Sequence, residues 1–153
     1  MTTAQSTAIE VYRRLLSTFD QANIACCILR NYEFLTEGED YDNADVDLLI
    51  ASEDFSRVAD ILGDLNFQKT TQSTVSKHIG YIAYNPPGHL LALDLHLDHP
   101  SWNDIPYADG RAILTGIIHK DSVPIPADRH TIQMLVFHSI LDKKNFKKKY
   151  IAI

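Results

Sequence analysis

Apolar residues recur along the chain with two different spacings, which predict its helices and strands. Spacings of three and four residues predict helices over residues 7–22, from Ser52 to about 65, and from Asp128 to about 142. Short continuous or alternating apolar runs predict strands over residues 24–29, 45–50, 67–71, within 74–84, and over 89–97. The last two flank Pro86-Pro87-Gly88 and should form a hairpin.

Cap residues support two of the predicted helix starts. Thr7 and Glu10 fit a capping box. Ser52 is a suitable N-cap for the second helix, because acidic residues follow it in the first turn, where the helix dipole favours them.

The segments between these elements complete the predicted order. Residues 31–44 are polar and acidic and predict a loop, whereas residues 101–127 are interrupted by three prolines and are the hardest to assign. The order is therefore helix, strand, loop, strand, helix, strand, hairpin, helix. It predicts an α/β (α+β) fold in which helices flank a mixed β-sheet.

Size and composition fit one globular domain. The chain has 153 residues, of which 45% are hydrophobic and 22% charged. We expect one domain over residues 1–142 and a basic tail over 143–153. Fourteen Lys and Arg against twenty Asp and Glu give a net charge of −6, which argues against a surface devoted to nucleic acid.

The sequence also predicts where the protein works. No apolar run approaches the ~20 residues that cross a bilayer, and the polar N-terminus does not resemble a signal peptide. Cys26 and Cys27 are adjacent within an apolar run, which fits two buried thiols in a reducing compartment. We therefore expect a cytoplasmic protein without a membrane partner.

Two predicted strands carry acids where strands usually carry apolar residues. The period of two places Asp45 and Asp47 on one face of their strand. It likewise places Asp94, His96 and Asp98 on one face of the later strand, opposite three leucines. Neighbouring like charges on a half-buried strand are costly unless a cation compensates them, and hard oxygen ligands suit Mg²⁺. The alternative is that both strands lie at a sheet edge and the acids are solvated.

The sequence resembles a known enzyme superfamily at these same positions. Ile28-Leu29-Arg30-Asn31-Tyr32-Glu33, an acidic stretch, Asp45-Val46-Asp47-Leu48-Leu49-Ile50 and later Leu93-Asp94-Leu95-His96 are the residues that carry the likeness. They resemble the nucleotidyltransferase superfamily with the polymerase-beta-like fold, in particular an uncharacterised bacterial and archaeal branch. Some members of that branch are joined to a thymidylate-kinase-like domain, so a further domain beyond the C-terminus is one expectation.

The resemblance implies a metal-dependent transfer reaction. In this superfamily three acids hold two Mg²⁺ ions, and a nucleoside monophosphate passes from an NTP, such as ATP, to an acceptor with release of pyrophosphate. By motif position, Asp45 and Asp47 would be the metal-bridging pair, and Asp94 would be the third acid. His96 would contact the acceptor or a phosphate, or would simply lie on the strand surface. The acceptor would be a small molecule, a glycan precursor, a protein or an RNA end.

One departure from the superfamily concerns nucleotide binding. Members normally have Gly-Ser or Gly-Gly at the end of the first strand, where backbone N–H groups meet the triphosphate. Here Arg30 and Asn31 stand at that point, and Arg30 would offer phosphate a charged bidentate contact instead. The departure leaves open a catalytically inactive module that keeps the fold. A further alternative is a metal-dependent hydrolase built on His89, His96 and His99, which lie near Asp94 and Asp98 in the sequence.

Overall fold

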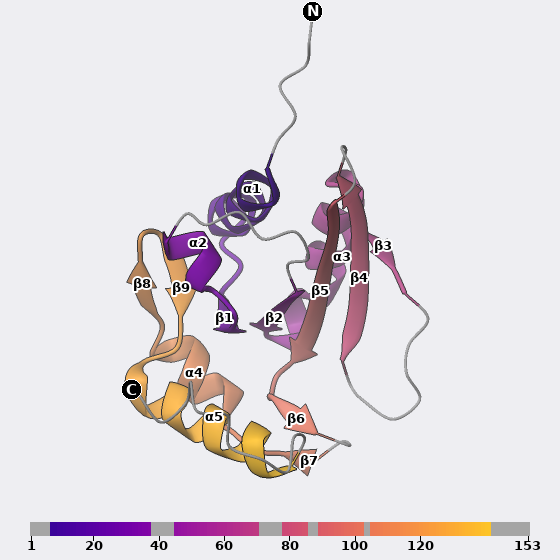
Figure 1. The fold of residues 1–153 in the computed structure, drawn as a ribbon. Coiled ribbons are helices and arrows are strands. Elements are labelled where there is room, and N and C mark those ends of the chain that lie inside the picture. Colours follow the sequence, from indigo (N-terminus) through magenta and orange to yellow (C-terminus); the bar gives the residue numbers. More distant parts are fainter. Residues whose placement is uncertain (1–6, 38–44, 71–77, 86–88, 103–104, 142–153) are drawn as a thin grey trace, which may run out of the picture.

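A mixed five-stranded sheet organises the chain, and two small two-stranded sheets lie beside it (Figure 1). The structure is a computed structural model, and it describes residues 7–37, 45–70, 78–85, 89–102 and 105–141. The strands of the main sheet are β1 (Cys26–Arg30), β2 (Asp45–Ile50), β3 (Gln68–Lys69), β4 (Ile79–Asn85) and β5 (His89–Leu97). The small sheets pair β6 (Ser101–Trp102) with β7 (Ile105–Pro106) and β8 (Ile118–Lys120) with β9 (Val123–Ile125).

The strand order confirms the predicted mixed sheet. The order is β1-β2-β5-β4-β3, in which β2 and β5 run parallel and the other neighbours run antiparallel. The helices are α1 (Ala8–Gln21), α2 (Glu33–Glu37), α3 (Phe55–Asp64), α4 (Gly110–Thr115) and α5 (Asp128–Leu141), with a 3-10 turn, η1, at Ser52–Asp54. The hairpin of β4 and β5 is as predicted. None of the helices within the described ranges is long and apolar enough to cross a bilayer.

One face of the main sheet is buried under α1 and α3. The apolar residues of α1, among them Tyr12, Leu15 and Phe19, pack in one cluster with Val58 and Leu62 of α3. The strand residues in that cluster include Ile28, Val46, Leu48, Ile50, Leu91, Leu93 and Leu95, which are all nearly inaccessible. Burying a side chain of this size stabilises a fold by roughly 1.5–3 kcal/mol, so this layer supplies most of the hydrophobic core.

The opposite face is covered at its β1–β2 side by α4 and α5 (Figure 1). A smaller cluster joins Cys27, Leu29 and Leu49 of the strands to Ile113 of α4 and Met134 of α5. Cys26 and Cys27 are both free and buried, as predicted, and burial raises the pKa of the Cys26 thiol to about 12. Neither thiol is therefore ionised or reactive near neutral pH.

The structure confirms one predicted cap and corrects the other. Thr7 and Glu10 form both hydrogen bonds of a capping box at the start of α1. Ser52, in contrast, does not cap a helix: it begins η1, and α3 follows at Phe55 without a side-chain cap. The backbone N–H of Ser52 instead donates to Oδ1 of Asp98 at 2.8 Å. A long-range contact has replaced the local one that the sequence suggested.

The predicted loop after β1 contains the short helix α2, which is a second correction. Its Phe34 and Leu35 are buried, and the Phe34 ring meets the Tyr12 ring edge-on at 5.8 Å between centroids. Packing against α1 therefore stabilises a turn that the polar sequence around it did not indicate. Residues 38–44 of the predicted loop and the basic tail over 143–153 lie outside the described residues.

Candidate functional site

Two of the predicted acids meet because β2 and β5 run parallel and in register. Asp47 is the direct partner of Asp94, and Asp45 is the partner of Ala92 two residues earlier. Partners in neighbouring strands point to the same face, and the alternation along β2 places Asp45 there as well. This face is the one opposite α1 and α3. The three acids that the superfamily resemblance singled out therefore share one surface of the sheet.

Asp47 is the most enclosed of the three acids. It is 3% exposed, and both of its carboxylate oxygens accept hydrogen bonds. Oδ2 accepts from Nε and Nη2 of Arg30 at 3.0 and 2.7 Å, and Oδ1 lies 3.2 Å from Nε2 of His96. Burial alone would raise the pKa of this carboxyl, but the hydrogen bond from His96 and the charge of Arg30 outweigh it and lower the pKa to about 2. Asp47 is thus an anion throughout the physiological pH range.

Asp45 is in the opposite electrostatic situation. It is exposed, yet its pKa is raised, first by partial desolvation and then by the charges of Asp47 and Asp94, against which Arg30 acts only weakly. The three carboxylates therefore repel one another across the face. A bound cation would relieve this repulsion.

A β-bulge in β1 aims Arg30 at Asp47. The antiparallel pairing with β2 shifts by one residue between Ile28 and Arg30, so that Arg30 rather than Leu29 lies opposite Asp47. Without this extra residue Arg30 would face the apolar layer under α1. Bulges of this kind bend a strand and redirect a side chain. No pattern in the sequence indicated the bulge.

Asn31 directly follows the bulge and has a left-handed backbone, with φ of 59°. Its Nδ2 donates to the carbonyl oxygen of Asp45 at 3.3 Å, which ties the end of β1 to the start of β2. Asn is the residue type that best tolerates this conformation after glycine. Asn31 therefore adopts a backbone that glycine favours, at the point where the superfamily normally has its glycine motif.

His96 follows Asp94 on the same face of β5 and is as enclosed as Asp47. It is 2% exposed, and its ring lies against that of His78, with 3.9 Å between the centroids. Nε2 of His78 lies 2.8 Å from the carbonyl oxygen of Ser101, so both rings are held in place. Because the Asp47 carboxylate can only accept, Nε2 of His96 carries the proton, and Nδ1 has no hydrogen-bond partner among the described residues. His96 thus donates a hydrogen bond that holds the Asp47 carboxylate in place.

His78 is a residue that the sequence did not single out. It precedes β4, and the hairpin pairs Ile79 with Leu95, so His78 falls beside His96. The hairpin register would have been needed to foresee this contact. Gly80, the partner of Asp94, is a second residue that the sequence did not single out. A Cβ at Gly80 would collide with Oγ1 of Thr70 and stand 3.6 Å from Oδ1 of Asp94. Glycine keeps the surface beside Asp94 open.

Three solved proteins share this arrangement of helices and strands. One is ANT(2'')-Ia, crystallised in complex with adenylyl-2''-tobramycin, with a TM-score of 0.57 and 15% identity over 96% of this chain and 85% of that one. A protein of Thermotoga maritima assigned as a nucleotidyltransferase gives 0.59 and 11% identity over 99% of both chains. An antigenic nucleotidyltransferase-like protein of Paracoccidioides brasiliensis gives 0.57 and 17% identity over 97% of this chain and 74% of that one.

The chain has a nucleotidyltransferase fold. No protein-family model matches the sequence, and no curated protein matches it significantly. At these identities the likeness concerns the fold, as the resemblance of the sequence had led us to expect.

The donor set on this nucleotidyltransferase fold suits a hard divalent cation. Three carboxylates share one face, and after partial desolvation the charges of Asp47 and Asp94 also raise the pKa of Asp45, a repulsion that a cation would relieve. Within the described ranges, however, no three His, Cys, Asp or Glu side chains already stand together as a metal centre. Both oxygens of Asp47 are held by Arg30 and His96. The residues fit a metal at Oδ2 of Asp47 provided that Arg30 leaves this oxygen, which accepts both of its hydrogen bonds.

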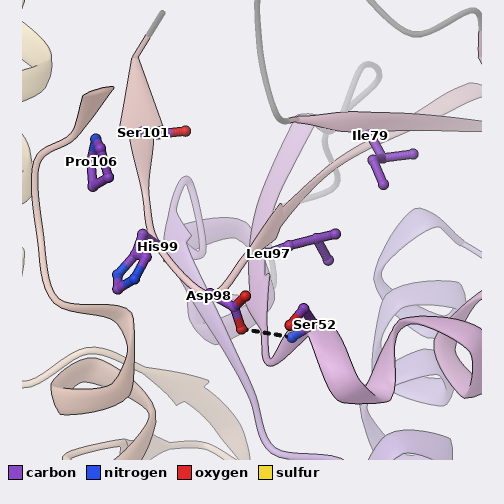
Figure 2. A pocket seen from close by; sticks show the side chains of 7 residues that line it. All are labelled: Ser52, Ile79, Leu97, Asp98, His99, Ser101 and Pro106. Atoms are coloured by element: carbon purple, nitrogen blue, oxygen red, sulfur yellow. Dashed lines mark hydrogen bonds between the residues drawn. The ribbon is translucent and has the colours of Figure 1, made fainter. Parts of the chain in front are cut away.

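A pocket of about 300 Å³ lies apart from the three acids, where β2 and β5 end (Figure 2). Its lining residues are Ser52, Ile79, Leu97, Asp98, His99, Ser101 and Pro106. Asp98 does not continue the acidic face of β5 as predicted, because the strand ends at Leu97 and Asp98 turns away with φ of 63° toward Ser52. His99 accepts from the backbone N–H of Gly110 at 3.3 Å. Asp98, His99 and His96 thus have separate partners, which does not favour the hydrolase alternative.

Proposed function

We propose that this chain is a divalent-metal-dependent nucleotidyltransferase, which moves a nucleoside monophosphate from an NTP to an acceptor hydroxyl or phosphate and releases pyrophosphate. The observation that carries the proposal is the register of the two parallel strands. It sets Asp47 beside Asp94 and keeps Asp45 on the same face, within a nucleotidyltransferase fold.

The three acids take the part of metal ligands in this proposal. Asp45 and Asp47 would hold two Mg²⁺ ions, with Asp94 as the third ligand on the acceptor side. Bound divalent ions of this kind neutralise charge on the triphosphate and lower the pKa of an acceptor hydroxyl. Asp94 is half-buried beside Gly80, which leaves room for an acceptor, and it would accept the hydroxyl proton.

The end of β1 would bind the nucleotide. Arg30 would contact a phosphate through its guanidinium group, which offers a planar fork of donors. The left-handed turn at Asn31 leaves the following backbone free to approach the phosphates, in place of the usual glycine motif. His96 would hold Asp47 in the correct orientation.

The acceptor class is the least determined part of the proposal. ANT(2'')-Ia, whose fold this chain shares, was crystallised with adenylylated tobramycin, so a hydroxyl-bearing small molecule is one class to test. A glycan precursor, a protein and an RNA end are the others. A panel drawn from these four classes, with each of the four NTPs, would find both substrates.

The test combines binding and turnover. Thermal unfolding of the wild type should shift upward with Mg²⁺ and NTP together, and the double variant Asp45→Asn/Asp47→Asn should lose that shift. Asp60→Asn/Asp64→Asn is the matched control, since it removes the same charge from exposed positions on α3. Pyrophosphate release with the acceptor panel then measures transfer. Equal shifts in all three proteins would contradict the proposed metal site.

A second candidate function is a binding module that keeps the fold without transferring nucleotides. The observation that favours it is that Asp47 already has protein donors on both oxygens. Binding of NTP with no pyrophosphate release for any acceptor would favour this module over the enzyme.

A further inference from the structure

The ion pair between Arg30 and Asp47 occupies an oxygen that the proposed metal needs. Two donors of Arg30, Nε and Nη2, converge on Oδ2 of Asp47, while His96 lies against Oδ1. A guanidinium group and a metal ion cannot both contact one carboxylate oxygen without bringing two positive charges together. Oδ2 therefore becomes available to a metal only when Arg30 moves, whereas Oδ1 accepts a single hydrogen bond, from His96.

Arg30 is the partner that is able to move. Its side chain is 22% exposed, whereas that of Asp47 is 5% exposed. His96 is almost fully enclosed and lies against the His78 ring, which is itself tied to Ser101. Arg30 is also the last residue of β1, next to the left-handed turn at Asn31. A rotation of its side chain breaks no strand pairing.

The bulge in β1 indicates that this ion pair is a built feature of the site. The shift in pairing between Ile28 and Arg30 places the guanidinium group on the carboxylate face, where regular pairing would have turned it toward the core. The strand loses regular pairing to bring the charge there. The arginine also compensates a buried carboxylate that would otherwise be strongly destabilising.

We infer that Arg30 is an exchangeable counter-cation, which holds Oδ2 of Asp47 in the free protein and passes to the triphosphate when metal and nucleotide bind. This inference rests on the proposed function. It has two consequences. The free protein binds a divalent metal weakly, because the metal must displace Arg30. Nucleotide draws Arg30 away and strengthens metal binding at Asp47, and by linkage metal strengthens nucleotide binding by the same factor.

Metal binding in the absence of nucleotide tests the first consequence directly. Mn²⁺ is the probe, and free Mn²⁺ is measured by electron paramagnetic resonance during titration of the wild type, Arg30→Gln and Arg30→Lys. Arg30→Gln keeps a hydrogen-bond donor for Asp47 but removes the charge, so Mn²⁺ should bind about tenfold more tightly or better. Arg30→Lys keeps the charge and should remain within about threefold of the wild type.

Arg57→Gln is the matched control for the loss of one positive charge. Arg57 belongs to α3, on the opposite side of the sheet, and pairs with Asp54 at 2.9 Å, so its replacement should leave Mn²⁺ affinity unchanged. Equal affinities in the wild type and Arg30→Gln would overturn the inference and leave the proposed metal site standing. If no variant binds Mn²⁺, and the Asp45→Asn/Asp47→Asn protein behaves identically, the proposed metal site fails as well.

A measurement on the wild type covers the case in which Arg30→Gln does not fold. The Nε–H of Arg30 is enclosed by its bond to Asp47, so its proton resonance should exchange slowly with water in the free protein. Saturation with Mg²⁺ and a non-transferable NTP analogue should shift this resonance as the guanidinium group changes partner from carboxylate to phosphate. An unchanged resonance under saturation would overturn the inference.

Discussion

In the part of the main sheet formed by β1, β2 and β5, the two faces carry different kinds of side chain. On the face under α1 and α3, Ile28, Leu48 and Leu95 are each at most 1% exposed and belong to the large apolar core cluster. On the other face the same strands present Arg30, Asp47, Asp94 and His96. The first face presents apolar side chains at these positions, whereas the second combines a smaller apolar cluster with a group of charged side chains.

Stability does not explain the charged face. A buried ion pair recovers little more than the desolvation it costs, and well-packed apolar residues in its place are often as stable or more so. The second face instead keeps three acids that repel one another, and it bends β1 to bring in a compensating arginine. Acids that repel one another, together with a bulge that brings an arginine to them, are unfavourable for folding, and such an arrangement is typical of a functional site.

The largest effect should follow from removing Asp94. We expect Asp94→Asn to lower nucleotidyl transfer by about 100- to 10,000-fold, since it removes a metal ligand and a proton acceptor. That corresponds to roughly 3–5 kcal/mol of transition-state stabilisation. The free energy of unfolding should hardly change, because the side chain is only half-buried and the charge it loses is repelled by Asp45.

The assay for this prediction is pyrophosphate release under saturating NTP, with unfolding in urea as the measure of stability. Asp64→Asn, on exposed α3, should keep full activity. A large loss of stability in Asp94→Asn would mean that the two faces do not separate function from packing.

Leu48→Ala should show the opposite pattern. Leu48 directly follows Asp47 on β2 but points to the opposite, apolar face of the sheet, and it is 1% exposed. We expect a loss of about 2–5 kcal/mol in the free energy of unfolding, from lost burial and the cavity left behind. Transfer activity per folded molecule should stay within about threefold of the wild type, since no charged group is touched. A drop in activity as large as that of Asp94→Asn would show that the faces are coupled.

Much of the fold could be predicted because it depends on local patterns. The capping box at Thr7, the alternation in β2 and the pairing of β4 with β5 are each encoded within short stretches of sequence. The sequence-based predictions were wrong where contacts between residues far apart in the sequence determine the local structure. Ser52 gives its backbone N–H to Asp98, 46 positions away, and α2 forms because Phe34 reaches Tyr12. No local pattern contains this information.

The candidate site likewise contains features that the sequence predicts and features that depend on distant contacts. The period of two was enough to place Asp45 with Asp47 and Asp94 with His96, and the resemblance linked the two strands. The partners of Asp47 were beyond reach, because a bulge sets the position of Arg30 and the hairpin register sets that of His78. Sequence therefore identified the acids, whereas structure identified what compensates them.

A smaller effect should appear in acid. The pKa of Asp47 is lowered to about 2 in the folded protein, below the usual value near 3.9 in an unfolded chain. Its contribution to stability, roughly 2 kcal/mol, is thus complete above about pH 4 and is lost as the pH falls toward 2. The Asp47→Asn protein has no carboxyl group at this position, so it lacks this contribution at every pH. The difference in unfolding free energy between the two proteins should therefore shrink across this range, as measured by urea unfolding at successive pH values.

Asp45 provides the contrast within the same face. Because its pKa is raised, Asp45→Asn should be neutral or slightly stabilising at neutral pH and should not alter the acid dependence in the same direction. If Asp45→Asn and Asp47→Asn gave the same pH profile, the ion pair with Arg30 would not be the source of the effect.

The smallest effect concerns the left-handed turn at Asn31, where the proposed nucleotide site begins. Asn31 has φ of 59°, which glycine adopts without strain and a β-branched residue adopts only at a cost of about 1–2 kcal/mol. Asn31→Gly should keep both stability and NTP affinity near those of the wild type, because it restores the residue type that the superfamily resemblance leads one to expect. Asn31→Val should lower both. Thermal unfolding and NTP titration of the two variants measure these effects, and an Asn31→Val protein as stable and as tight-binding as Asn31→Gly would show that the left-handed turn is dispensable.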